Sequence, residues 1–339
     1  MPVARSASAV LLLLLGLPLL SGEAHAAEPG LPLLVLERTI PLPGVSGRID
    51  HMAVDLRRGR LLVAELGNGT VEAIDLAAGK VVHRIIGLKE PQGVGYSPRD
   101  DLVAVASAGD GSLRLFRGDD LAPVGTVPLG DDADNVRLDT RANRFVVGYG
   151  SGGLAILDPV TRSVVGKIEL PAHPEGFQLD PSAGRAYVNV PDAGQVAVLD
   201  LVTGKQVASW RVPGLRANFP MTLDGVGAVL ATVFRHPARL VLLDTKNGGV
   251  LANLATCDDA DDVFFDAKRR RVTVSCGDGT VDILQQNQDA AGYRPVARIQ
   301  TQSGARTSLL VPELDRLFVA APARLLGKGA AILVFRPMP

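Results

Sequence analysis

A unit of about 42 residues recurs along this chain of 339 residues, and the repeat constrains the fold more than any other sequence feature. Each copy has four short apolar segments, separated by turns rich in Gly, Asp or basic residues. The clearest copy covers residues 176–212. The first segment of each copy ends at an anchor position that returns every 41 to 45 residues: Asp55, Ser97, Asp139, Asp180, Asp224, Asp266 and Val311.

Seven copies of four strands at this spacing predict an all-β fold, a seven-bladed β-propeller of four-stranded antiparallel blades. Apolar and polar residues alternate in residues 71–75 and 113–116, which favours strands over helices. The last copy has only three strands, whereas residues 33–42 resemble the fourth strands of other copies. We therefore expect the N-terminal strand to complete the last blade and close the ring, which removes a free sheet edge.

The N-terminus has the features of a secretory signal peptide. Arg5 provides a positive charge, residues 9–20 form an apolar run, and residues 24–26 (Ala-His-Ala) fit a cleavage site. The apolar run is too short for a bilayer core, which needs about 20 residues. We predict a signal peptide at residues 1–26, cleaved near Ala26/Ala27, and a single propeller domain at residues 27–339. The mature protein is then periplasmic or secreted, without a membrane span.

The fourth copy carries a family resemblance. Residues 186–189 read Ala-Tyr-Val-Asn, and residues 196–205 read Val-Ala-Val-Leu-Asp-Leu-Val-Thr-Gly-Lys. This pattern resembles the YVTN-type (YncE-like) seven-bladed β-propeller repeat family, and the resemblance covers essentially the whole mature chain. It implies an exported bacterial member whose repeat residues specify the architecture and not an activity.

The charge of the chain is nearly balanced, with a net charge of −1 at pH 7. This balance excludes a globally basic nucleic-acid binder, and the hydrophobic fraction of 47% excludes wholesale disorder. Basic residues do gather in the turns between first and second strands, but acidic residues share these turns. We expect local ion pairs on that face, and nucleic acid is not an expected partner because stacking aromatics are scarce.

The order of strands predicts where a binding site would lie. The loops that precede each first strand and follow each second strand share one face, which we call the top face. The first strand of each blade is innermost, so the residues that begin it surround the mouth of the central channel. The candidate ligand-binding residues are those that begin the seven first strands: Asp50, His51, Gln92, Asp134, Asn135, Glu175, Asn218, Asp261, Asp262 and Arg306.

Two of these segments, residues 131–135 and 258–262, are acidic and nearly identical. They lie three repeats apart, so we expect them on opposite sides of the channel. Clustered carboxylates favour a hard cation, which makes Asp134, Asp261 and Asp262 candidate ligands for Ca²⁺. The alternative is that these short side chains accept hydrogen bonds from backbone amides of their own turns.

Arg48, His51 and Arg306 belong to the first and last copies, which are neighbours in a closed ring. We expect them to form a positive sector opposite the acidic segments, able to hold a carboxylate or a phosphate. The alternative for this sector is ion pairing with the nearby Asp50 or Glu90, and for His51 a structural hydrogen bond.

Cys257 and Cys276 are the two cysteines of the chain. Cys257 precedes the first strand of the sixth copy and Cys276 ends its second strand, so antiparallel pairing brings both to the top face. Export permits a disulfide. We predict a bridge between them that pins residues 258–262, and two free thiols are the alternative.

Three functions remain open. The first is an exported, non-catalytic binding or scaffold protein that recognises a small ligand, a metal ion or a protein partner at the top face. It is expected to be a monomer with no cofactor other than the candidate Ca²⁺. The second is a lactonase-type hydrolase, with His51, Glu175 and Arg306 as candidate catalytic residues. The third is single-stranded nucleic-acid binding, which the charge layout disfavours.

Overall fold

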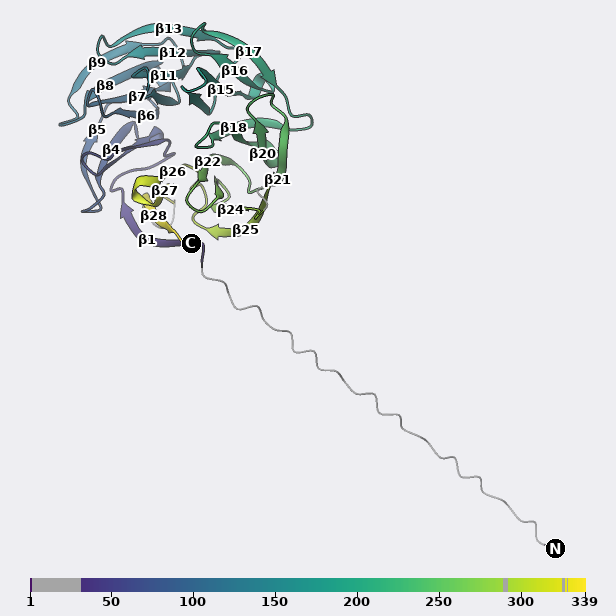
Figure 1. Cartoon of the computed structure of the whole chain (residues 1–339). Coiled ribbons are helices and arrows are strands. Elements are labelled where there is room, and N and C mark those ends of the chain that lie inside the picture. Colours follow the sequence, from purple (N-terminus) through teal and green to yellow (C-terminus); the bar gives the residue numbers. More distant parts are fainter. Residues whose placement is uncertain (2–31, 289–291, 325–326, 328) are drawn as a thin grey trace. The chain divides into compact units, whose positions relative to one another are not determined.

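The computed structural model describes Met1 and residues 32–339, except residues 289–291, 325–326 and 328. The predicted signal peptide therefore lies outside the described residues, apart from Met1. Residues 33–339 form a ring of seven four-stranded antiparallel sheets, shown in Figure 1, which confirms the predicted all-β propeller. No helix among the described residues has the length and apolarity to cross a membrane.

Blades 1 to 6 are each built from four consecutive strands, because short turns join strands that pair with their chain neighbours. Blade 1 contains β2 (Met52–Asp55), β3 (Arg60–Glu65), β4 (Thr70–Asp75) and β5 (Lys80–Ile85), and blade 2 contains β6 (Pro91–Ser97), β7 (Leu102–Ser107), β8 (Ser112–Arg117) and β9 (Pro123–Pro128). Blade 3 contains β10 (Val136–Asp139), β11 (Arg144–Tyr149), β12 (Gly153–Asp158) and β13 (Ser163–Glu169), and blade 4 contains β14 (Phe177–Asp180), β15 (Arg185–Val190), β16 (Gln195–Asp200) and β17 (Lys205–Trp210). Blade 5 contains β18 (Arg216–Leu223), β19 (Val229–His236), β20 (Ala238–Asp244) and β21 (Val250–Ala255), and blade 6 contains β22 (Ala260–Asp266), β23 (Arg271–Cys276), β24 (Thr280–Gln286) and β25 (Tyr293–Gln300). Single 3₁₀ turns occur at Leu66–Asn68, Ala108–Asp110, Pro191–Ala193 and Pro312–Leu314.

Blade 7 takes strands from both ends of the chain. It contains β26 (Ser308–Val311), β27 (Arg316–Ala321), β28 (Ala331–Pro337) and β1 (Leu34–Pro41). β1 is the outer strand and pairs antiparallel with β28, from Leu34 opposite Pro337 to Pro41 opposite Ala331. The predicted closure of the ring by the N-terminal strand is therefore confirmed.

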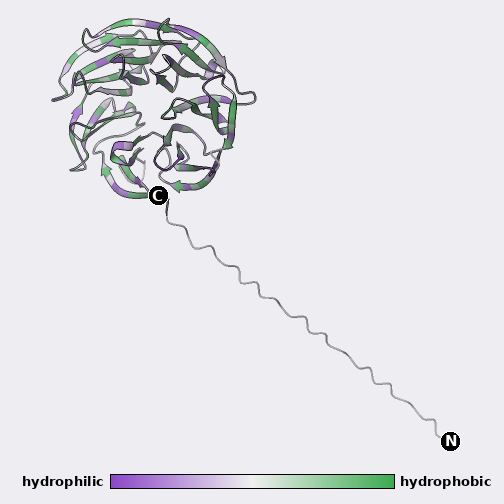
Figure 2. Ribbon diagram, in the orientation of Figure 1, coloured by the Kyte–Doolittle hydropathy of each residue, from purple (hydrophilic) through white to green (hydrophobic). Residues whose placement is uncertain are grey.

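The hydrophobic core lies between the blades. Seven apolar clusters each join two adjacent blades, as where Phe145 of blade 3 packs with Leu113 of blade 2. Figure 2 shows hydrophobic residues along the strands of every blade. The seven first strands contact one another in sequence around the axis, so they form the wall of the central channel. Each blade thus buries both faces, and the residues that begin the first strands meet at one mouth.

The recurring Asp residues are part of the scaffold. Asp139 accepts hydrogen bonds from the backbone amides of Arg141 and Ala142, both at 3.0 Å, and so closes the turn after β10. Asp200 does the same after β16, from the amides of Val202 and Thr203 at 2.9 and 2.8 Å. A short side-chain carboxylate satisfies turn amides that no strand partner reaches, which explains why the repeat keeps Asp at strand ends.

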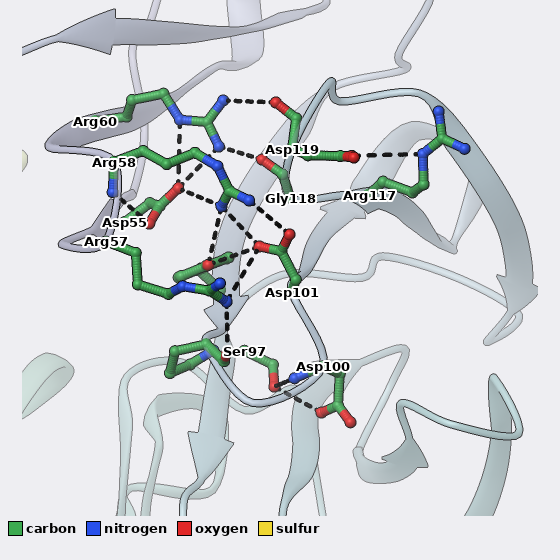
Figure 3. A network of polar contacts seen from close by, with 12 residues as sticks. Asp55, Arg57, Arg58, Arg60, Ser97, Asp100, Asp101, Arg117, Gly118 and Asp119 are labelled. Carbon is green, nitrogen blue, oxygen red and sulfur yellow. Dashed lines mark hydrogen bonds and ion pairs between the residues drawn. The ribbon is translucent and has the colours of Figure 1, made fainter.

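The turns opposite the top face contain the predicted local ion pairs, and Figure 3 shows one such network. Arg58, after β2, donates to Asp55 of its own blade at 3.1 Å and to Asp101 of blade 2 at 2.6 and 2.7 Å. The hydrogen bonds from Arg58 lower the pKa of Asp101 to about 2. These basic residues are therefore neutralised by their neighbours and tie blade 1 to blade 2.

The predicted disulfide is confirmed. Cys257 lies in the loop between β21 and β22, Cys276 ends β23, and their Cα atoms are 5.9 Å apart. Both cysteines are buried in the cluster between blades 5 and 6. The bridge holds the acidic loop, residues 258–262, against the second strand of its own blade.

Replacing both cysteines with serine is expected to lower the free energy of unfolding by about 3 kcal/mol, because the bridge closes a loop with a sequence separation of 19 residues. Urea unfolding followed by intrinsic fluorescence measures this loss. Wild-type protein unfolded with its bridge reduced is the matched control, and it should approach the midpoint of the variant. An unchanged midpoint in the double variant would show that the bridge adds no stability.

Candidate functional site

One residue per blade occupies the position five residues before the anchor, where the chain turns into the innermost strand. The seven residues are Asp50, Gln92, Asp134, Glu175, Phe219, Asp261 and Arg306. Six of the seven, all except Asp50, line a cavity of about 190 Å³ at the top-face mouth of the channel. We call this the upper cavity. The ring topology thus gathers side chains that are far apart in sequence.

The upper cavity contains eight of the ten predicted ligand-binding residues. They are His51, Gln92, Asp134, Asn135, Glu175, Asp261, Asp262 and Arg306. Asp50 is buried beside the cavity and forms an ion pair with Arg48 at 2.9 Å, the alternative considered for that arginine. Burial raises the pKa of Asp50 to about 6, although His51 and Arg48 oppose the shift.

Asn218 is turned away from the upper cavity. The register of β18 against β19 shifts between Asn218 and Met221, so the chain is offset by a bulge there. The fully buried side chain of Asn218 donates to Asn189 Oδ1 at 2.6 Å and to the carbonyl of Gln195 at 3.0 Å. It therefore joins blade 5 to blade 4, and the next residue, Phe219, lines the cavity in its place.

The acidic loop of blade 6 is paired with arginines. Asp261 accepts from Arg235 at 2.7 Å through Oδ1 and lies 3.2 Å from Arg306 through Oδ2. Arg306 also contacts Asp259, and the guanidinium of Arg235 lies 3.9 Å from the centre of the Phe219 ring. The prediction that Arg306 faces the acidic segments from the opposite side is wrong, because blade 7 adjoins blade 6 as well as blade 1.

These contacts leave the three candidate Ca²⁺ ligands apart. Asp261 uses both oxygens in ion pairs, and Asp262 accepts the backbone amide of Ser308 at 2.7 Å. Within the described part of the chain, the His, Asp and Glu residues of the cavity do not bring three ligand atoms within 4.8 Å of one another. The arrangement does not favour a Ca²⁺ site built from Asp134, Asp261 and Asp262.

The acidic loop of blade 3 contacts a histidine from the loop before blade 4. His173 Nδ1 donates to the carbonyl of Gly150 at 2.6 Å and lies 3.5 Å from Asp132, and its Nε2 lies 3.9 Å from Asp134 Oδ2. Burial lowers the pKa of His173, but the contacts with Asp134, Gly150 and Asp132 outweigh burial and raise it to about 9. His173 is therefore protonated at neutral pH.

Two buried oxygens on the cavity wall are unsatisfied. Asp134 and Asn135 are only 5% and 2% exposed. The amide of Asn135 donates to Asp134 Oδ2 at 3.2 Å, but Asp134 Oδ1 and Asn135 Oδ1 have no hydrogen-bond partner among the described residues. Buried acceptors without donors are costly, so this wall is suited to a ligand that donates hydrogen bonds.

The floor of the upper cavity is charged. His51, Arg137 and Asp262 line both the upper cavity and a second cavity of about 370 Å³ below it in the channel. Burial and the neighbouring Asp261 raise the pKa of Asp262 to about 7, although His51 opposes the shift. Burial also raises the pKa of Glu175 to about 7, with Asp134 and Asp261 adding to it. The site therefore holds two carboxyl groups that titrate near neutrality.

The predicted site leaves out three basic contributors to this cavity: Arg137, His173 and Arg235. Arg137 lies two residues before its anchor, and its equivalents in the other blades are neutral. That contrast was the available signal. Arg235 ends a second strand, so a search limited to the start of first strands does not reach it. His173 lies in a top-face loop, but a His-Pro pair is also common in simple turns and so gives no clear sign of a site.

Among the comparisons with known proteins, the solved structures support the fold. No family model matches the chain, and no curated protein matches it. Among solved structures, a chain of hydrazine synthase from Kuenenia stuttgartiensis has a TM-score of 0.73 at 14% identity, and covers 86% of this chain and 98% of its own. A chain of a mitotic checkpoint complex has a TM-score of 0.76 at 13% identity, over 97% and 98%. At these identities the likeness shows the propeller fold alone.

Proposed function

We propose that the protein is an exported, non-catalytic binding protein that holds a small polar ligand in the upper cavity. One observation carries this proposal: Asp134 and Asn135, which line the cavity, each have a buried side-chain oxygen without a hydrogen-bond partner among the described residues. Hydrogen-bond donors of a ligand would satisfy them, and the surrounding side chains are already held by ion pairs, which preorganises the site.

The wider setting is part of the same proposal. The residue pattern of the repeat, clearest at residues 186–205, supports membership of the YVTN-type (YncE-like) propellers. The signal-peptide pattern at residues 1–26 supports export to the periplasm or outside the cell, and a disulfide fits an oxidising compartment. We propose that the protein acts as a monomer.

A lactonase-type hydrolase is the second candidate, and Glu175 is the observation that favours it. Its pKa of about 7 suits a general base at neutral pH. Glu175 begins the inner strand of blade 4 and lines the cavity together with His51 and Arg306. Turnover of a sugar lactone that is lost in Glu175→Gln would establish this candidate in place of simple binding.

A panel of small polar compounds tests the binding proposal. Sugars, polyols, amino acids, sugar lactones and CaCl₂ are added to the protein, and thermal unfolding and calorimetry measure binding. We expect at least one organic compound to bind. Asp134→Asn should weaken that binding about ten- to hundredfold, because a charged hydrogen bond is worth about 1.5–3 kcal/mol. Asp119→Asn, at an exposed position outside the cavity, is the matched control and should leave the affinity unchanged. The proposal fails if no compound binds, or if Asp134→Asn binds as tightly as wild type.

A further inference from the structure

We propose that the ligand is a small zwitterion of the amino-acid type, with its carboxylate on Arg137 and its ammonium group on Asp134 and Asn135. This inference rests on the proposed function and names the chemical class that the upper cavity selects. It follows from which charged groups of the cavity are already paired and which are not.

Most cations around the upper cavity already have a carboxylate partner. Arg48 pairs with Asp50, Arg235 and Arg306 pair with the acidic loop of blade 6, and His173 contacts Asp132 and Asp134. These groups hold the blades together at the mouth of the channel. A ligand that used them would have to displace an existing ion pair.

Arg137 differs from these cations. No carboxylate oxygen of the described residues lies within 4.0 Å of its guanidinium nitrogens, although the charges of Asp262 and Asp134 act on it from farther away. Its one hydrogen bond to a described residue goes to the carbonyl of Val136 at 3.0 Å. It projects from β10 into the channel at a level where the other blades supply only neutral side chains, and it lies 5.5 Å from the centre of the Phe177 ring. The equivalent residues are Ala53, Gly95, Gln178, Thr222, Phe264 and Leu309.

The guanidinium therefore has unused donors on the cavity floor. Arginine offers five N–H donors in a planar fork, and a carboxylate accepts two of them in parallel. A guanidinium with no carboxylate in direct contact, in a partly enclosed channel, binds such an anion more strongly than an exposed one would. Protonation of Asp262, whose pKa is raised to about 7, lessens its repulsion of that anion. The floor of the upper cavity is suited to the carboxylate of a ligand.

The cavity wall at Asp134 and Asn135 favours a positively charged group of the ligand. Asp134 Oδ1 and Asn135 Oδ1 are both acceptors, and Asp134 brings a negative charge. An ammonium group has three donors and no acceptor, so one such group can satisfy both oxygens. A carboxylate placed there would instead face Asp134 and be repelled.

The volume of the upper cavity and the charges around it together limit the chemical class of the ligand. The volume of about 190 Å³ is below the range of about 300–1,000 Å³ of drug-sized sites. A sugar or polyol would leave Arg137 without an anion in contact, a simple anion would leave the wall oxygens of Asp134 and Asn135 unsatisfied, and a simple cation would leave the donors of Arg137 unused. A small molecule with both charges satisfies both ends.

Blocked derivatives of one ligand test the inference on the wild-type protein. Thermal unfolding with the twenty standard amino acids identifies the best binder, and calorimetry then compares it with its amide, which lacks the carboxylate, and its N-acetyl derivative, which lacks the ammonium group. We expect each derivative to bind at least tenfold more weakly than the free amino acid. If either derivative binds as tightly as the amino acid, the inference is wrong.

Two variants assign the ends of the ligand. Arg137→Met is expected to bind the amino acid and its amide equally well. Asp134→Asn is expected to bind the amino acid and its N-acetyl derivative equally well. Arg99→Met, in a turn on the opposite face, is the matched control and should keep both preferences. If Arg137→Met still prefers the amino acid over its amide as wild type does, the ligand carboxylate does not bind Arg137. Binding of a sugar or polyol without any amino acid would overturn the inference and leave the proposed function standing, whereas no binding of any compound would end both.

Discussion

A chain that begins at residue 44, and so lacks β1, is expected to lose the closed ring and most of its stability. β1 is the outer strand of blade 7, and without it β28 becomes an unpaired edge. Ile40 and Leu42, 1% and 2% exposed, would also leave the cluster between blades 7 and 1. Burial of each side chain is worth about 1.5–3 kcal/mol, a large share of a typical stability of about 5–15 kcal/mol.

Urea unfolding and size-exclusion chromatography measure this effect. The chain that begins at residue 32 keeps β1 and is the matched control, expected to be monomeric with one cooperative transition. The shorter chain should aggregate through the exposed edge of β28, and a synthetic peptide of residues 33–43 added during refolding should restore part of its stability. Equal unfolding midpoints for the two chains would show that β1 is not needed for closure.

The propeller could be predicted from the sequence because each blade is specified locally. Alternating apolar residues form the strands, and the Asp at a strand end, such as Asp139 or Asp200, closes the following turn with its own side chain. A blade repeats these local signals seven times, so a single weak copy does not obscure the pattern. Closure by β1 followed from a count of strands in the last copy.

The upper cavity was predicted less completely, because its pairings cross between blades. Arg235 of blade 5 pairs with Asp261 of blade 6, and Arg306 of blade 7 reaches the same carboxylate. Neither pair is a sequence neighbour, and the spacing of the repeat does not say which way a long side chain turns. Asn218 shows a second reason: a bulge of β18 offsets the register, and local spacing does not reveal a bulge.

Replacing Glu65 with Gln is expected to stabilise the protein at alkaline pH. Glu65 ends β3 and is fully buried, and Thr70 Oγ1 donates to its Oε2. Two nearby carboxylate oxygens, Oε1 of Glu65 and Oε2 of Glu72, have no hydrogen-bond partner among the described residues. The other oxygen of Glu72 accepts from Arg84 Nε at 2.8 Å. A proton on Glu65 removes the repulsion between the carboxylates of Glu65 and Glu72. Burial first, and then Glu72, raise the pKa of Glu65 from 4.5 to about 8.

The sign of the pH dependence follows from this raised pKa. Between pH 4.5 and about 8 the folded protein keeps a proton that the unfolded chain releases, so the contribution of Glu65 to stability is intact below pH 4.5 and is lost as pH rises to about 8. The full loss is at most about 5 kcal/mol. Glutamine keeps an acceptor for Thr70 and a donor for Glu72, so it mimics the protonated form without titrating.

Urea unfolding of both proteins from pH 4 to pH 9 gives the difference in unfolding free energy, which removes the contributions of other titrating groups such as His173. We expect Glu65→Gln and wild type to be nearly equal at pH 4 and the variant to be more stable by several kcal/mol at pH 9. Glu313→Gln, on the surface after β26, controls for the loss of one carboxyl group. A difference for Glu65→Gln that stays constant across this range would mean that Glu65 is ionised in the folded protein and that Arg84, which already bonds Glu72, neutralises both carboxylates.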